Sequence, residues 1–191
     1  MPNLILASTS PRRLEILRRA GLEDLRVVPP EVEENIRPNA SPEEAAAYWS
    51  REKALSVMSD GDDVIVGADT VVWHDRRILG KPVGADEARE MLRQLSGDWH
   101  KVYTGVTVLH NGQTRTEVEI TRVLMRPLTE AQIDAYVRTG EPMDKAGAYG
   151  IQDRGALLVE RVEGDFYNVM GLPLYRLSRM LEQAGLYLLG D

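Results

Sequence analysis

The chain has 191 residues, which is enough for one compact domain with a sizeable core or for one domain with two lobes. Hydrophobic residues make up 43% and charged residues 28% of the chain, which is ordinary for a folded globular protein and argues against disorder. The lack of cysteine excludes disulfides, thiolate zinc sites and a cysteine nucleophile, and the net charge of -7 disfavours a broad nucleic-acid-binding surface.

A strand, a tight turn and a helix are expected at the start of the chain. Leu4–Ala7 is a short apolar run, which is typical of a buried strand. Ser10 suits a helix N-cap and Pro11 the first helical position, and Gly21 is the expected C-terminal stop of that helix. A second strand is expected around residues 27–28.

Two more helices flank a second buried strand. Residues 41–44 form a capping box, which predicts a helix that runs to about Met58. The continuous apolar run Val64–Ala68 predicts a strand, and residues 71–73 continue in an extended conformation. The next helix is expected from about Asp86 to Leu95.

The second half of the chain begins with a hairpin signal. Asn111-Gly112 stands between two alternating apolar runs, which is a strong indication of a β-hairpin. A second capping box at residues 129–132 predicts a helix that stops near Gly140. A strand is expected over residues 156–162 and an amphipathic helix from Pro173. Because strands and helices intermix, we expect the α/β class with a mixed sheet.

The turn Ser8-Thr9-Ser10-Pro11-Arg12-Arg13 is the first candidate site. A helix start exposes unpaired N–H groups and the positive end of the helix dipole, so it attracts anions. Arginine adds forked donors that match phosphate oxygens. The alternative is a well-capped helix with solvated arginines, and the spacing alone leaves both possibilities open.

Acidic residues provide a second candidate site. Asp69 follows the buried run at residues 64–68, where a carboxylate is well placed to hold a metal or a water, although a strand-ending aspartate in a turn is commoner. Hard cations prefer several carboxylate oxygens, so one residue of the acidic loop Glu31, Glu33 and Glu34 could share a metal with Asp69. The three histidines lack ligand spacing, so a zinc site is not expected.

Three lysines and one glutamine complete the candidates. Lys53, Lys81 and Lys145 could each contact phosphate, although a single lysine is more often at the surface. Residues 141–152 are rich in glycine and other small residues, which lets a flat ligand approach the backbone closely. Gln152 could bind a base edge, because an amide both donates and accepts. The alternative is a flexible connector with an exposed glutamine.

Together and in this order, these segments resemble the Maf family, also called septum-formation inhibitor-like proteins. The resemblance extends along nearly the whole chain. The matching segments are Leu6–Arg13, Glu33-Glu34, Arg51–Ala54, Gly67–Val72, Gly80–Pro82, Leu95–Gly97 with His100, Asp144–Gln152 and Asn168–Pro173.

The resemblance implies an α/β fold similar to that of the inosine-triphosphate pyrophosphatases. This fold is an elongated, two-lobed mixed sheet with flanking helices and a cleft between the lobes. We therefore expect one domain over residues 1–191 with no separable linker. The resemblance also implies hydrolysis of nucleoside triphosphates between the α- and β-phosphates with magnesium, manganese or cobalt. Asp69-Thr70 and residues 144–152 are similar to the dTTP/UTP branch, whose products are the nucleoside monophosphate and inorganic diphosphate (pyrophosphate).

Residue roles follow from the same resemblance. Arg12, Thr70 and Gln152 match the specificity positions of the family, and Asp69 matches its proposed proton acceptor, although Asp69 could equally be a metal ligand. The expected substrate-binding residues are Ser8, Ser10, Arg12, Arg13, Lys53, Thr70, Lys81 and Gln152. The expected metal ligands are Glu34 and Asp69.

Several alternatives stay open. Hydrolysis of dTTP and UTP would serve house-cleaning of the nucleotide pool, but the same chemistry could instead act on CTP, 7-methyl-GTP or modified nucleotides. A different class is a non-catalytic nucleotide-binding regulator of septum formation, which would bind dTTP without metal-stimulated turnover. The first residues do not form a signal segment and no apolar run is long enough to span a bilayer, so we expect a cytosolic protein with neither membrane nor nucleic-acid partners. A homodimer is possible, because dimers are common among relatives.

Overall fold

The computed structural model describes residues 3–32, 40–57, 59 and 61–189. Its strands are β1 (Leu4–Ala7), β2 (Leu25–Val28), β3 (Val64–His74), β4 (Arg77–Leu79), β5 (Trp99–His110), β6 (Gln113–Met125) and β7 (Val159–Glu163). Its α-helices are α1 (Pro11–Arg19), α2 (Pro42–Leu55), α3 (Ala85–Leu95), α4 (Glu130–Val137), α5 (Phe166–Met170) and α6 (Leu174–Glu182). Three 3-10 helices are η1 (Glu141–Asp144), η2 (Ala146–Ala148) and η3 (Asp153–Leu158).

The strands form one mixed sheet. Its hydrogen-bonded order is β2-β1-β3-β5-β6-β7, with β4 paired to β3 outside this path. β1 is parallel to β2 and β3, whereas the β3–β4 and β6–β7 pairs are antiparallel. The expected α/β class with a mixed sheet and flanking helices is thus confirmed.

The chain divides into two compact units. Unit 1 comprises Met1–Asp69, Thr104–Glu119 and Gly171–Asp191, and unit 2 comprises Thr70–Tyr103 and Ile120–Met170. β3, β5 and β6 contribute residues to both units. The assignment of one inseparable domain and the cleft between lobes stay predictions.

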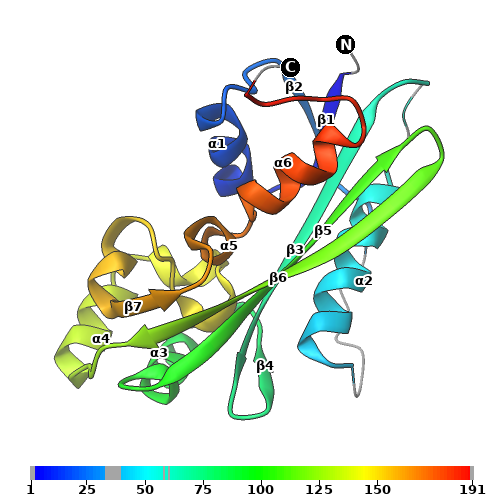
Figure 1. Cartoon of the computed structure of the whole chain (residues 1–191). Coiled ribbons are helices and arrows are strands. Elements are labelled where there is room, and N and C mark those ends of the chain that lie inside the picture. Colours follow the sequence, from blue (N-terminus) through cyan, green and yellow to red (C-terminus); the bar gives the residue numbers. More distant parts are fainter. Residues whose placement is uncertain (1–2, 33–39, 58, 60, 190–191) are drawn as a thin grey trace. The chain divides into compact units, whose positions relative to one another are not determined.

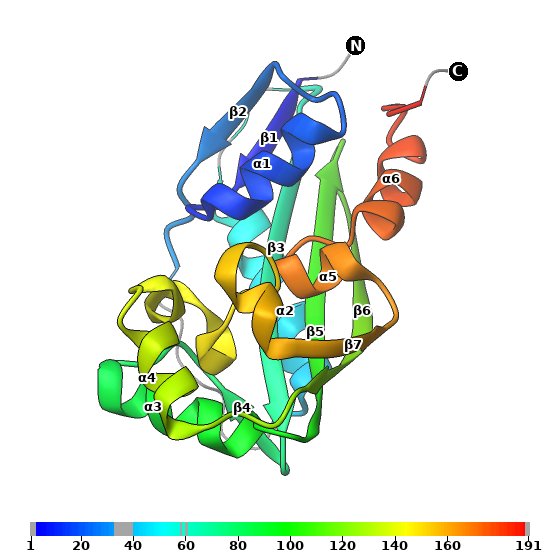
Figure 2. The same cartoon turned by 90° about the vertical axis from the view of Figure 1, so that its left-hand side faces the viewer.

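In unit 1, helices cover both faces of the sheet. Figures 1 and 2 show α2 on one face and α1 with α6 on the other. α2 lies directly on the strands, because a Cβ atom at Gly67 would be 2.3 Å from the carbonyl oxygen of Ser50 and one at Gly105 would be 2.1 Å from that of Ala46. Glycine in these strands therefore permits close approach of the helix backbone.

The α2 helix begins as the sequence predicts. The Ser41 hydroxyl accepts the Glu44 N–H and the Glu44 carboxylate accepts the Ser41 N–H, which completes the capping box. On the inner face, Ala54 and Val57 join Ile5, Ala7 and Ile65 in a small buried cluster. This packing and the cap fix where α2 lies along the sheet.

Unit 2 has its own core. The helices α3 and α4 pack beside each other (Figure 2). Their buried side chains join those of β3, β5 and β6 in one cluster. Gly147 lies against β3, since a Cβ atom at that glycine would be 3.0 Å from the Val72 side chain. A bulge at Leu124/Met125 interrupts the β6–β7 pairing.

Several predicted elements are confirmed and others need correction. The hairpin forms, with φ positive at both Asn111 (49°) and Gly112 (73°), as a type I′ turn requires. The strand expected from Ala156 is wrong at its start, because residues 153–158 form η3 and β7 begins only at Val159. β4 and α5 were not predicted. Residues 141–152 are not a flexible connector but contain η1 and η2, and half of these residues are buried.

Within residues 3–32, 40–57, 59 and 61–189, no helix combines the length and the apolar character that crossing a bilayer requires.

Candidate functional site

The turn after β1 is ordered by Ser8 and Arg13. The Ser8 hydroxyl accepts the backbone N–H of Ser10 at 3.0 Å and an Arg13 guanidinium N–H at 3.5 Å. The Arg13 Nε donates to the carbonyl oxygen of Gly171 at 2.7 Å. Ser8 is 3% and Arg13 is 8% exposed. Arg13 is therefore not a solvated arginine, because it anchors the start of α1 to the segment before α6.

Ser10 and Arg12 occupy the first turn of α1. Ser10 is the N-cap and Pro11 follows it, as the sequence predicts, but the Ser10 side chain makes no capping hydrogen bond. Arg12 is half-buried in this turn. A helix start of this kind, with an arginine beside it, is chemically suited to binding an anion.

Lys53 and Asp69 form a buried ion pair. The Lys53 Nζ lies 2.6 Å from the Asp69 Oδ1, and the two side chains are 8% and 10% exposed. The expectation that Lys53 lies at the surface is wrong. The description of Asp69 as a strand-ending residue is also wrong, because β3 continues to His74.

Strand register brings the turn near this ion pair within unit 1. β1 and β3 are parallel, and Ala7 pairs with Gly67. Ser8 follows the first of these residues and Asp69 lies two residues after the second. Ligand sites of open α/β sheets occur at the carboxyl ends of parallel strands, and β1 ends at this place. The turn at residues 8–13 and the Asp69 carboxylate, which the sequence predicts as candidate sites, therefore belong to one region.

Unit 2 holds Thr70 and Lys81. Thr70 is half-buried and Lys81 is exposed. The carbonyl oxygen of Gly80 accepts the Gly147 N–H at 3.1 Å, which ties the segment around Lys81 to η2. Val72 follows Thr70 by two residues, so both project from the face of β3 against which Gly147 packs.

The segment around Gln152 is compact. Gln152 is half-buried, and its Oε1 atom is buried with no hydrogen-bond donor among the described residues. Lys145 covers Gly150, because a Cβ atom there would be 2.6 Å from the Lys145 Cε. The Lys145 Nζ donates to the Glu141 carbonyl at 2.6 Å and to the Asp144 carboxylate at 2.7 Å. Lys145 is thus engaged within the segment, and Gln152 presents a buried acceptor.

His100 and Tyr149 form a buried pair that the sequence did not single out as interacting. The His100 Nε2 is 2.6 Å from the Tyr149 hydroxyl oxygen, and the rings meet edge to face. Burial lowers the pKa of His100 to about 3, with the charge of His74 adding to the effect and that of Asp98 opposing it. Burial also raises the pKa of Tyr149. Both groups are therefore neutral near pH 7, and the pair holds η2 against β5.

Only part of the predicted metal site lies among the described residues. Glu33 and Glu34 lie outside the described residues, whereas the N–H of Glu31 donates to the Ser56 hydroxyl at 3.2 Å. Within the part of the chain that the structure describes, no group of three His, Asp or Glu side chains is arranged to hold an ion. Asp69 still suits a hard cation, because a carboxylate has enough lone pairs to bind both an ion and Lys53.

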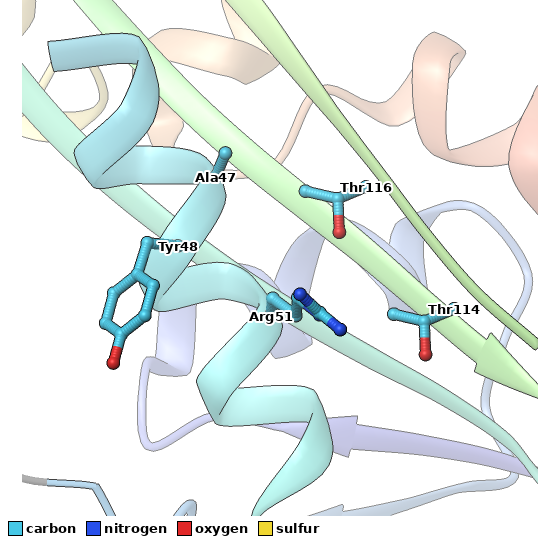
Figure 3. Close-up of a pocket in the computed structure, with 5 residues that line it drawn as sticks. All are labelled: Ala47, Tyr48, Arg51, Thr114 and Thr116. Atoms are coloured by element: carbon cyan, nitrogen blue, oxygen red, sulfur yellow. The ribbon is translucent and has the colours of Figure 1, made fainter. Parts of the chain in front are cut away.

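One pocket has a lining that includes none of these residues. It has a volume of about 380 Å³ and is lined by Ala47, Tyr48, Arg51, Thr114 and Thr116 (Figure 3). Figure 3 shows the Arg51 side chain directed toward the two threonines. Thr116 is hydrogen-bonded to Thr107 and Thr107 to Ser50, each at 2.9 Å. These hydroxyl groups link α2 to the sheet, and none of the predicted site residues lines the pocket.

The sequence is similar to one protein family along nearly its whole length. The family model described as Maf-like protein matches residues 3–184. A dTTP/UTP pyrophosphatase from Bacillus cereus (strain G9842) is 47% identical over 184 residues, which cover 96% of each chain. A protein of the same name from Bacillus thuringiensis subsp. konkukian (strain 97-27) is 48% identical with the same coverage.

Solved structures add a fold comparison. A HAM1 protein from Coxiella burnetii matches with a TM-score of 0.52 and 13% identity, covering 96% of this chain and 100% of that one. The Staphylococcus aureus Ham1 protein matches with a TM-score of 0.50 and 12% identity, covering 95% and 98%. At these identities the likeness concerns the fold alone.

Proposed function

Because the chain belongs to the Maf family, we propose that it is a nucleoside triphosphate pyrophosphatase whose substrates are dTTP and UTP. The observation that carries this proposal is near-full-length similarity, at 47% identity, to relatives named dTTP/UTP pyrophosphatase. The products would be the nucleoside monophosphate and pyrophosphate.

The reaction places demands on charge that the turn after β1 can meet. A water oxygen forms a bond to the α-phosphorus while the bond from that phosphorus to the bridging oxygen breaks, so pyrophosphate leaves with added negative charge. In our proposal the start of α1, with Ser8, Ser10 and Arg12, receives phosphate oxygens. Arg13 contacts phosphate with its guanidinium or holds this turn in shape, and Lys81 adds a further cation.

Asp69 is the proposed acceptor of the water proton. Its buried position in β3 is supported by the Lys53 ammonium at 2.6 Å, which balances the carboxylate charge. A buried, oriented carboxylate needs little reorganisation when the proton moves. The same position suits a metal ligand, so the two roles are alternatives within one proposal.

A divalent cation is part of the proposal. Asp69 and Glu34 would hold it, and it would supply Lewis-acid polarisation of phosphate oxygens and a more acidic water. Magnesium, manganese and cobalt ions are all coordinated by carboxylate oxygens.

Gln152 is the proposed reader of the base. Uracil and thymine carry an imide N–H between two carbonyl oxygens, and a side-chain amide can pair with such an edge. The support is the buried Gln152 Oε1 atom, which lacks a donor among the described residues. An imide N–H would satisfy this acceptor, and leaving it unsatisfied is costly.

The first test replaces Asp69 with asparagine. Pyrophosphate release from dTTP, UTP, CTP, GTP and 7-methyl-GTP is measured with each divalent metal. We expect Asp69→Asn to abolish nearly all turnover while the protein stays folded, whereas Asp62→Asn, at an exposed position before β3, should behave like the parent. Undiminished turnover by folded Asp69→Asn would refute the assignment.

The second test addresses the base. Gln152→Ala is compared on dTTP and on GTP, and we expect the larger loss of kcat/KM on dTTP. An equal fractional loss on both would mean that Gln152 does not read the base.

The substrate panel also separates the competing functions. Preference for CTP, 7-methyl-GTP or a modified nucleotide would replace the proposed substrates within the same chemistry. A non-catalytic regulator of septum formation would bind dTTP without metal-stimulated turnover. The cytosolic location and the homodimer stay predictions.

A further inference from the structure

The Tyr136 hydroxyl links α4 to the segment that carries Gln152. Tyr136 is 5% exposed. Its hydroxyl donates to the Glu141 carboxylate at 2.8 Å and accepts the backbone N–H of Gly150 at 3.2 Å. One buried phenol therefore holds the chain two residues before Gln152.

The Glu141 carboxylate holds the chain on the other side of Gln152. Besides the Tyr136 hydroxyl, it accepts the N–H of Gly155 at 2.9 Å and the N–H of Arg154 at 3.2 Å. Hydrogen bonds to a carboxylate are stronger than those between neutral groups. Glu141 thus fixes residues two and three positions after Gln152.

The two anchored ends also touch each other. A Cβ atom at Gly155 would lie 1.8 Å from the Gly150 carbonyl oxygen and 2.8 Å from the Tyr136 hydroxyl. Residues 150–155 therefore form a closed loop with Gln152 inside it, and only glycine fits at position 155. Movement of either end would displace the Gln152 amide.

We propose that Tyr136 and Glu141 are positioning residues that set the pyrimidine selectivity through the Gln152 loop. This inference rests on the proposed function, in which Gln152 reads the base. In this proposal each side chain acts on the backbone of residues 150–155 and not on the substrate. A site group must be held to within a fraction of an ångström, and supporting hydrogen bonds provide that precision.

The hydrogen-bonding pattern of the base predicts which substrates are discriminated less well when residues 150–155 become more mobile. An amide held in one orientation offers an acceptor to the imide N–H of uracil or thymine, whereas the flipped amide offers a donor that suits cytosine. Loss of the Tyr136 and Glu141 hydrogen bonds should let Gln152 adopt both orientations. Discrimination between dTTP and CTP should therefore fall, while the bond-breaking step is unaffected.

The test uses Tyr136→Phe in the full-length protein. Steady-state kcat and KM are measured for dTTP and CTP, together with the melting temperature. We expect KM for dTTP to rise and the dTTP-to-CTP ratio of kcat/KM to fall by about fivefold, the factor for one lost hydrogen bond, with kcat for dTTP within about twofold of the parent. Tyr167→Phe, at an exposed tyrosine of unit 2, is the matched control and should keep the parental ratio.

Two substitutions of Glu141 add a rescue test. Glu141→Gln keeps an oxygen that can serve Tyr136 and Gly155, whereas Glu141→Ala removes all three hydrogen bonds. We expect Glu141→Gln to stay within about twofold of the parental ratio and Glu141→Ala to lower it by about tenfold. If Glu141→Ala does not fold, Tyr136→Phe decides alone.

The outcomes separate this inference from the proposed function. A lower melting temperature with an unchanged dTTP-to-CTP ratio in Tyr136→Phe would mean a purely structural role and would overturn the inference. In that case Gln152→Ala would still change the ratio if the proposed function is correct. A parent protein that releases no pyrophosphate from dTTP would overturn both.

Discussion

His100 should make the protein lose stability in mild acid. It is 2% exposed, and burial lowers its pKa to about 3, from about 6.5 for an ordinary histidine. Between these two values the unfolded chain binds a proton that the folded chain does not bind. The folded state therefore has its full stability above pH 6.5 and loses stability as the pH falls toward 3.

The size of the effect follows from the two pKa values. Each pH unit below 6.5 costs about 1.4 kcal/mol until the folded-state pKa is reached, so the loss at pH 5 is about 2 kcal/mol. For a chain of this length, 1 kcal/mol corresponds to about 2–4 °C in melting temperature. His100 alone should thus lower the melting temperature by about 4–8 °C between pH 7.5 and pH 5.

The assay is thermal unfolding at pH 7.5 and pH 5 for the parent and for His100→Gln. Carboxylates that titrate in this range affect both proteins alike. The difference between the two proteins in the loss of melting temperature therefore reports the contribution of the His100 imidazole. We expect His100→Gln to lose about 4–8 °C less than the parent on acidification. Tyr149→Phe is the control, because it keeps the imidazole buried and should keep the acid sensitivity. Equal acid sensitivity of the parent and His100→Gln would refute the reasoning.

Three further predictions concern stability and activity. Lys53→Met removes the cation from a buried ion pair, so urea unfolding should show a loss of about 3–5 kcal/mol in the free energy of unfolding. Turnover should also fall, because Asp69 loses its partner. A loss of stability under about 1 kcal/mol would contradict this prediction. Gly67→Ala places a Cβ atom 2.3 Å from the α2 backbone and should sharply lower the melting temperature, whereas Gly80→Ala, with open space, should not. Ser41→Ala should cost about 1 kcal/mol in urea unfolding by removing the α2 cap, and an unchanged midpoint would argue against it.

Local signals allowed much of the fold to be predicted. The capping boxes before α2 and α4 and the Asn111-Gly112 turn depend on neighbouring residues, so they are legible in the sequence. The start of β7 was placed three residues early, because the apolar residues of η3 resemble a strand and Asp153 has a positive φ of 57° that no local pattern reveals.

The sequence predicts which residues form the candidate site, but it does not reveal their contacts. The burial of Lys53 depends on Asp69, 16 residues away on another element, and isolated lysines usually lie at the surface. Gly67 offered a signal, since glycine inside a strand often marks close backbone approach. The roles of Tyr136 and Glu141 depend on contacts with the backbone around Gln152, which the order of residues alone does not show.

The α2 backbone packs directly on two glycines of the sheet, with no side chain between them, and this limits which substitutions the sequence can tolerate there. Most helices pack on a sheet through a layer of side chains, in which a larger residue at one position can be compensated by a smaller one at another. Here the carbonyl groups of Ala46 and Ser50 sit where the Cβ atoms of Gly105 and Gly67 would be, so no such exchange is available. Any larger residue at either glycine lifts the whole helix, and Lys53 with it. Substitution at these two glycines is therefore a test of function as much as of folding.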